Sequence, residues 1–181
     1  MARKRSKARI ISDFLVQLNE EAQVKASGVK NNIVHVQYQL PSGGIDTLSP
    51  TAAWTKYALN TIIVNQIGEG VTLVSNKLYL PEGVYYVEGT GISYLSGNAS
   101  IRLKNGVAPV GIIQGVTVFS RYDATTNRGH QLQMDVRGVM AVNAGDYIAL
   151  ERYYTTDYSS SRTLATGDNE ILADLMVRRL D

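Results

Sequence analysis

A two-residue alternation of apolar and polar side chains, cut by turns, is the feature that most constrains the fold of this chain. In residues 131–137, for example, apolar Leu132, Met134 and Val136 stand between polar neighbours. Such a pattern predicts a strand with one buried face. About eight segments of this kind follow residue 50, at 61–65, 77–80, 84–94, 101–104, 111–119, 131–137, 147–154 and 174–178. Short strands at this spacing predict an all-β sandwich or barrel.

Turn residues separate the expected strands, at 81–83 (Pro-Glu-Gly), 105–106 (Asn-Gly) and 144–146 (Ala-Gly-Asp). The 16 glycines and 11 tyrosines of the chain also fit short strands joined by tight turns. After Pro81 we expect Gly83 to adopt a positive φ, so that a valine there would damage the fold. The segment 111–119 differs from the others because it is more continuously apolar.

The sequence divides at about residue 50, into an N-terminal arm of residues 1–50 and a β domain of residues 51–181. Within the arm, Val34 and Val36 belong to an alternating segment, which predicts a half-buried strand over 33–40. One strand and one short helix bury too little apolar area to offset chain entropy. The arm must therefore lie on its own C-terminal domain, on a sister subunit or on another protein.

The start of the arm is strongly basic, although the net charge of the whole chain is only +2. The basic residues are Arg3, Lys4, Arg5, Lys7 and Arg9. After them, Ile10, Phe14 and Leu18 recur four residues apart, which predicts a short amphipathic helix. A basic arm on a neutral body is typical of an end that meets an acidic protein surface or, without sequence specificity, nucleic acid. A disordered soluble tail is the simpler alternative.

The sequence offers no recognisable catalytic or metal site. It has no cysteine, so disulfides, thiolate nucleophiles and Cys-ligated metals are excluded. His35 and His130 lie in different segments without the paired ligands that zinc requires. Asp168 and Glu170 could join loop carboxylates around calcium, but a solvated loop is the favoured interpretation. We therefore expect no enzyme, no cofactor and no metal. No segment has the pattern of a signal peptide or a membrane span, so no membrane partner is expected.

Residues 153–162 are rich in tyrosine, threonine and serine, which predicts an exposed polar loop. The side chains in this loop that would contact a ligand are Tyr153, Tyr154, Tyr158 and Arg162.

Two stretches resemble a structural module of bacteriophages that occurs at tail-fibre tips and in free-standing virion proteins. They are 54–61 (Trp-Thr-Lys-Tyr-Ala-Leu-Asn-Thr) and 78–85 (Leu-Tyr-Leu-Pro-Glu-Gly-Val-Tyr). The second stretch, with Lys-Asn-Gly at 104–106 and Gly-Asp at 145–146, is also similar to the globular heads of complement-type and tumour-necrosis-factor-like proteins. The resemblance covers about residues 54–180. The sequence departs from the phage pattern at Lys56-Tyr57, where arginine is usual, and at Gly89 and Gly91, where larger side chains are usual.

The resemblance implies a jelly-roll β-sandwich that assembles as a tight homotrimer. In the strand expected at 84–94, one face should carry Tyr85, Val87, Gly89 and Gly91, and the other Tyr86, Glu88, Thr90 and Ile92. Tyrosines on both faces of one strand offer apolar surface to a partner. The alternative is that the rings only cap the sheets of a monomer.

Together these features predict a non-enzymatic virion protein, made in the host cytoplasm and located on the capsid surface or the tail. It would be a homotrimeric capsid decoration, cement or head-fibre protein. The five basic residues, Phe14 and Leu18 would anchor it to the major capsid protein or another virion protein. The initiator methionine and the lack of a shaft repeat favour a stand-alone protein. The alternative is an adhesin, the receptor-binding tip of a tail or head fibre, reading a host surface glycan through residues 153–162. A third hypothesis is glycan cleavage by carboxylates from distant strands.

Overall fold

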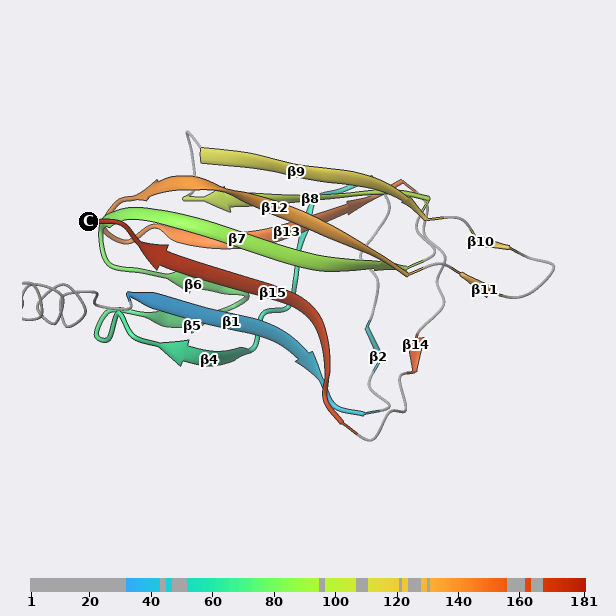
Figure 1. The fold of residues 1–181 in the computed structure, drawn as a ribbon, viewed down its shortest axis with the longest axis horizontal. Coiled ribbons are helices and arrows are strands. Elements are labelled where there is room, and N and C mark those ends of the chain that lie inside the picture. The colour runs from blue at the N-terminus through green and yellow to red at the C-terminus, as the bar shows by residue number, and fades with distance from the viewer. Residues whose placement is uncertain are drawn as a thin grey trace, which may run out of the picture. The chain divides into compact units, whose positions relative to one another are not determined.

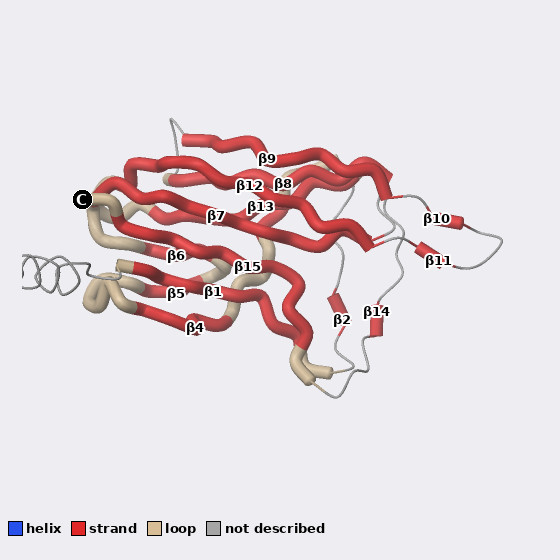
Figure 2. The backbone as a smooth tube through the Cα atoms, in the orientation of Figure 1, coloured by secondary structure: helices blue, strands red, loops and turns tan. Residues whose placement is uncertain are grey.

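The computed structural model is built of strands in the part of the chain that it describes, shown in Figures 1 and 2. The described residues are 32–42, 45–46, 52–94, 97–106, 111–120, 122–123, 128–129, 131–155, 162–163 and 168–181. Their strands are β1 (Ile33–Leu40), β2 (Ile45–Asp46), β3 (Thr55–Lys56), β4 (Thr61–Asn65), β5 (Thr72–Val74), β6 (Lys77–Tyr79), β7 (Gly83–Tyr94), β8 (Gly97–Asn105), β9 (Gly111–Ser120), β10 (Tyr122–Asp123), β11 (Arg128–Gly129), β12 (Gln131–Val142), β13 (Tyr147–Tyr154), β14 (Arg162–Thr163) and β15 (Glu170–Arg179).

Two antiparallel sheets make up the sandwich. The first sheet has the strand order β12-β7-β15-β1-β4, and the second has the order β5-β6-β13-β8-β9, with β3 also paired to β13. Apart from the consecutive pairs β5–β6 and β8–β9, neighbours in each sheet come from distant parts of the sequence, so most connections cross between the sheets. The predicted all-β jelly roll is confirmed. Two short pairs, β10–β11 and β14–β2, lie beyond one end of the sheets (Figure 1).

The strand expected in the N-terminal arm lies inside this sandwich. β1 pairs with β15 on one side and with β4 on the other. Residues 32–181 form one compact unit, which therefore begins before β1 and not at residue 50. The arm was expected to lie on its own C-terminal domain, on a sister subunit or on another protein. Its strand β1 lies on its own C-terminal domain. The expected helix around Phe14 lies outside the described residues.

Side chains from alternate positions of both sheets fill the core. Val34 and Val36 of β1 pack with Leu175 and Val177 of β15 and with inward side chains of the second sheet such as Ile101, and all five are fully buried. Burying a side chain of this size stabilises the fold by about 1.5–3 kcal/mol. The alternation expected for the C-terminal segment is confirmed, since Leu175 and Val177 are inside while Met176 between them is exposed.

Two glycines of β7 give room to large side chains of the opposite sheet. As expected, Gly89 and Gly91 share the buried face with Tyr85 and Val87. A Cβ at Gly89 would lie 2.6 Å from Leu150 Cδ1, and one at Gly91 would collide with the ring and hydroxyl of Tyr57. These glycines, which depart from the phage pattern, are therefore part of the fit between the sheets.

The turn residues behave as expected with one exception. Gly106 and Gly145 have positive φ values of 64° and 83°. Gly83 does not, so the predicted conformation there was wrong. Glycine fits at position 83 for steric reasons, because a Cβ there would lie 2.9 Å from Asp181 Oδ1 and 3.1 Å from Arg179 Nε.

Candidate self-association face

The sandwich is closed on one side where β9 of the second sheet meets β12 of the first. Glycine makes this close approach possible on both strands. A Cβ at Gly115 would lie 2.5 Å from the backbone carbonyl oxygen of Asp135 and 2.6 Å from Ile101 Cγ2. A Cβ at Gly138 would lie 2.6 Å from Ile113 Cδ1. The spacing of β9 and β12 therefore depends more on Gly115 than on Gly138, because the atom nearest to a Cβ at position 115 belongs to the backbone and cannot rotate away.

Large apolar side chains lie exposed along this edge. Ile112, Val116 and Phe119 of β9 are 44%, 56% and 63% exposed, and Val139 of β12 is 59% exposed. We call these four residues the β9–β12 patch. Clustered exposed apolar side chains on a folded domain mark a surface that another molecule covers. The patch was not predicted from the sequence, although the continuously apolar run at 111–119 was the signal for it.

A groove of about 650 Å³ adjoins the patch and is shared by three strands. Its polar side chains are Glu88 and Thr90 of β7, Gln114 of β9, and Gln133, Asp135 and Arg137 of β12. Arg137 stands directly opposite Glu88 in the β12–β7 register, and Asp135 opposite Thr90. Val116 of the patch lines the same groove. A concave polar site bordered by apolar side chains resembles the core and rim of a protein interface.

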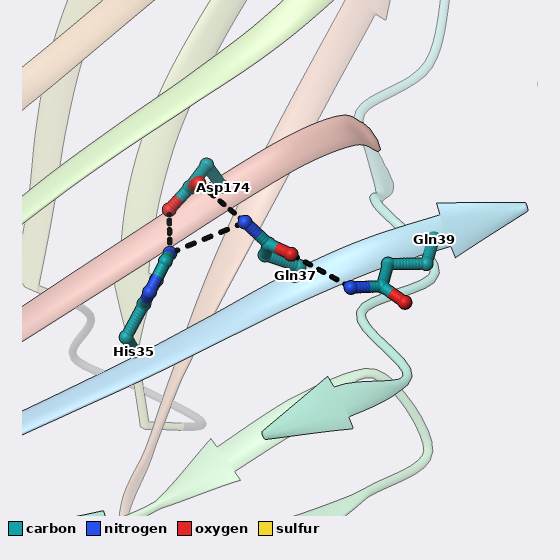
Figure 3. A network of polar contacts seen from close by, with 4 residues as sticks. All are labelled: His35, Gln37, Gln39 and Asp174. Atoms are coloured by element: carbon teal, nitrogen blue, oxygen red, sulfur yellow. Dashed lines mark hydrogen bonds and ion pairs between the residues drawn. The ribbon is translucent and has the colours of Figure 1, made fainter. Parts of the chain in front are cut away.

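The outer face of the first sheet continues from the groove as an ordered polar network, drawn in Figure 3. His35 Nε2 lies 2.6 Å from Asp174 Oδ1, and Gln37 Nε2 donates to Asp174 Oδ2 at 3.0 Å. Gln39 Nε2 donates to Gln37 Oε1 at 2.8 Å. These bonds satisfy Gln37, which is only 7% exposed although it lies on the outer face. His35 is thus a hydrogen-bonded side chain of the sheet, and His130 lies outside the described residues.

The outer face of the second sheet is organised around a buried ion pair. Glu151 Oε2 of β13 accepts a hydrogen bond from Arg102 Nε at 2.7 Å, and Arg102 Nη2 forms an ion pair with the same oxygen at 2.6 Å. The Arg102 guanidinium stacks over the Trp54 ring at 4.1 Å, and that ring packs against Tyr153 with centroids 5.4 Å apart. Trp54 therefore fastens the β3 segment to the sheet through an arginine that is always charged.

The ligand loop expected at 153–162 begins later than predicted. Tyr153 and Tyr154 belong to β13, with Tyr153 half-buried against Trp54 and Tyr154 only 2% exposed. The alternation of β13 turns Tyr154 into the sandwich, so its placement in an exposed loop was wrong. Arg162 lies in β14, whose backbone pairs with β2, and Tyr158 lies outside the described residues.

The predicted anchoring residues, Arg3, Lys4, Arg5, Lys7, Arg9, Phe14 and Leu18, also lie outside the described residues. Within the described part, no group of three or more histidines, aspartates or glutamates is placed to hold a metal ion. That part also contains no helix long and apolar enough to cross a membrane.

A charged cluster fixes the C-terminal residues to the start of β7. Arg179 Nε donates to Asp181 Oδ1 at 2.7 Å, and the backbone amide of Val84 donates to Asp181 Oδ2 at 3.3 Å. The hydrogen bond from Arg179 lowers the pKa of Asp181 below its ordinary value. Burial raises the pKa of Tyr85, and the nearby Arg179 charge only partly opposes this. The Tyr85 hydroxyl donates to the carbonyl oxygen of Pro81 at 2.7 Å.

No protein-family model and no curated protein matches the sequence, but many solved structures match the fold. One is the globular domain of the zebrafish complement 1qA protein, with 13% identity, a TM-score of 0.55, and coverage of 83% of this chain and 98% of that one. Another is murine APRIL in a structure at pH 5.0, with 12% identity, a TM-score of 0.52, and coverage of 82% and 98%. The chain has the jelly-roll fold of these globular domains. At this identity the likeness shows the fold alone, and it confirms that part of the sequence resemblance.

Proposed function

We propose that this protein is a non-enzymatic, homotrimeric structural protein of a bacteriophage particle, a capsid decoration, cement or head-fibre protein. The observation that carries the proposal is the β9–β12 patch, an exposed apolar strip beside a polar groove on a closed sandwich. The phage setting rests on the resemblance of residues 54–61 and 78–85 to the phage module. The jelly-roll fold agrees with the fold that this resemblance implies.

Self-association is the use that the patch supports best. About half of each of its four side chains remains exposed, so covering each one would contribute roughly 1 kcal/mol. The adjoining groove carries both signs of charge, which suits a partner with a mixed polar surface. In a threefold ring, each copy would cover the patch of one neighbour with a different surface of its own, a head-to-tail contact. Such head-to-tail contacts close into a ring when the rotation allows, and the resemblance sets the ring at three copies.

In this proposal the anchor is the region before the compact unit. The five basic residues, with Phe14 and Leu18, would hold each trimer on an acidic surface of the major capsid protein or another virion protein. Many copies on one particle make weak contacts effective together. No catalytic role is proposed for the His35–Asp174 pair, because its second hydrogen-bond partner is the amide of Gln37, which is not a nucleophile.

Particle binding tests the proposal. Deleting residues 1–31 leaves the compact unit 32–181 intact and is expected to abolish binding to particles that lack the protein, while the trimer persists. Electron cryomicroscopy of the native particle is expected to show threefold density on the shell or at a head fibre. Full occupancy by the deleted protein would contradict the anchoring role. Binding to host cells without binding to capsids would favour the adhesin alternative.

A further inference from the structure

The outer face of the second sheet carries an excess of positive charge. Lys56, Lys77, Arg102 and Lys104 all project from this face, and the register places Glu151 among them as its carboxylate. Arg102 and Glu151 neutralise each other through their ion pair and hydrogen bond. The remaining three lysines make no ion pair with a carboxylate of the described residues. We call this surface, defined by the three lysines, the lysine face.

The lysines are spread over three strands and are not gathered at one point. Lys56 of β3 stands opposite Glu151 of β13, and Lys104 of β8 stands opposite Ala149 of the same strand. Lys77 of β6 lies with its Nζ 4.3 Å over the Tyr147 ring of β13. Because neighbouring strands lie about 4.8 Å apart, β3 and β8 hold their lysines about 10 Å apart across β13. A chain with negative charges at intervals along its length would meet this spacing better than a single small anion would.

The opposite face of the sandwich has a different charge pattern. On the first sheet the arginines Arg137 and Arg178 are accompanied by carboxylates, with Arg137 opposite Glu88. Asp174 on that face is bound to His35 and Gln37. On the outer face of the first sheet, the two arginines are thus balanced in number by Glu88, Asp135 and Asp174, whereas the outer face of the second sheet carries a positive excess.

Groups that bond to hydroxyls lie beside the lysines. The Ser100 and Thr117 hydroxyls are 2.7 Å apart on β8 and β9, and exposed Gln114 stands opposite Arg102. The Trp54 ring, by contrast, has Arg102 over it and Tyr153 against it. A nucleic-acid base would find no free aromatic face there on which to stack, whereas a sugar chain can use cations, hydroxyls and amides on a flat sheet.

We propose that the lysine face binds an acidic polysaccharide, a chain whose carboxylates or sulfates pair with Lys56, Lys77 and Lys104. The sugar hydroxyls bond to Ser100, Thr117 and Gln114. This inference goes beyond the proposed structural role and rests on different charged residues, because none of the three lysines belongs to the β9–β12 patch. The two surfaces are neighbours, since Lys104 stands opposite Ile112 of the patch and Gln114 also lines the groove. It gives the module a carbohydrate ligand through a sheet face and not through the loop expected at 153–162.

The test uses the full-length chain, so that the N-terminal basic residues contribute equally in every sample. Binding to polygalacturonate oligosaccharides is measured by calorimetry at low salt, with dextran as the uncharged control. Replacing Lys56 and Lys104 together by glutamine is expected to weaken binding by roughly four- to twenty-five-fold, about two- to fivefold for each half-exposed cation. Dextran is expected not to bind.

Arg178→Gln on the first sheet is the matched control for Lys104→Gln, since both remove one half- or fully exposed positive charge. The control is expected to keep wild-type affinity, and circular dichroism checks that each variant is folded. Unchanged affinity in the Lys56→Gln/Lys104→Gln protein would overturn the proposal, as would equal loss in Arg178→Gln. Tighter binding of oligothymidylate than of polygalacturonate, lost in the same lysine variant, would reassign the face to nucleic acid.

Discussion

Replacing Gly115 by alanine is expected to destabilise the sandwich at the edge that carries the candidate interface. The added Cβ would lie 2.5 Å from the Asp135 carbonyl oxygen, 2.6 Å from Ile101 Cγ2 and 2.7 Å from Val136 Cβ. Two of these three atoms belong to the backbone or the Cβ of β12, so neither can rotate away, and the strands must separate. Overpacking of this kind costs about 1–3 kcal/mol.

Part of that cost is offset in the unfolded chain, because alanine loses about 0.4–1 kcal/mol less conformational freedom than glycine on folding. Near the centre of both ranges the net loss is about 1–2 kcal/mol, which for a domain of this size lowers the melting temperature by roughly 2–8 °C. Thermal unfolding followed by circular dichroism measures it. Separation of β9 from β12 is also expected to weaken self-association.

Gly138→Ala is the matched control on the same edge. Its Cβ would meet the Ile113 Cδ1 atom at 2.6 Å, but this is the end of a side chain that can rotate. We expect a smaller loss of stability there than at Gly115. The reasoning is refuted if Gly115→Ala melts at the wild-type temperature, or if Gly138→Ala is the more damaging change.

Three further predictions address the core, the ion pair and pH. Gly91→Ala is expected to cost about 1–3 kcal/mol in urea unfolding because its Cβ meets Tyr57, and adding Tyr57→Leu should recover part of the loss; no recovery would argue against that contact. Arg102→Ala leaves the carboxylate of Glu151, which is 4% exposed, buried without its cation, and should lower the free energy of unfolding by about 3–5 kcal/mol. The double variant Arg102→Met/Glu151→Gln removes both charges and should lose much less stability; equal losses in urea unfolding would contradict this reasoning. The raised pKa of Tyr85 means that its neutral form stabilises the fold fully below pH 10, and this contribution is lost as pH rises through the folded-state pKa. Absorbance at 295 nm should show one tyrosine fewer among those that titrate above pH 10 in Tyr85→Phe, and an unchanged titration above pH 10 would refute this.

The strands were largely predictable from sequence because a two-residue period reports directly which side chains are buried. The expected segments 61–65 and 147–154 coincide with β4 and β13. The same alternation continues past Tyr153 along β13, so the side chain of Tyr154 is buried and does not belong to a loop. Composition rich in tyrosine, threonine and serine suggested a loop there, and packing on the opposite sheet outweighed it.

The candidate interface was not predictable in the same way. Alternation shows which face of a strand is buried but not which strand lies next to it, so the meeting of β9 with β12 through Gly115 and Gly138 has no local signal. The reason for glycine at position 83 was likewise invisible, because its neighbours Arg179 and Asp181 lie almost a hundred residues away in sequence. The expected placement of the N-terminal residues stays a prediction.

Sedimentation equilibrium of the full-length protein tests the central claim, self-association through the β9–β12 patch, most directly. We expect the wild type to sediment at three times the 19.8 kDa mass of the chain, and Val116→Asp/Phe119→Asp at the mass of one chain. Ile63→Asp, at a similarly exposed apolar position on the far edge strand β4, should keep the wild-type mass. A wild type that stays monomeric over the whole concentration range, or a patch variant that keeps the wild-type mass, would contradict the account.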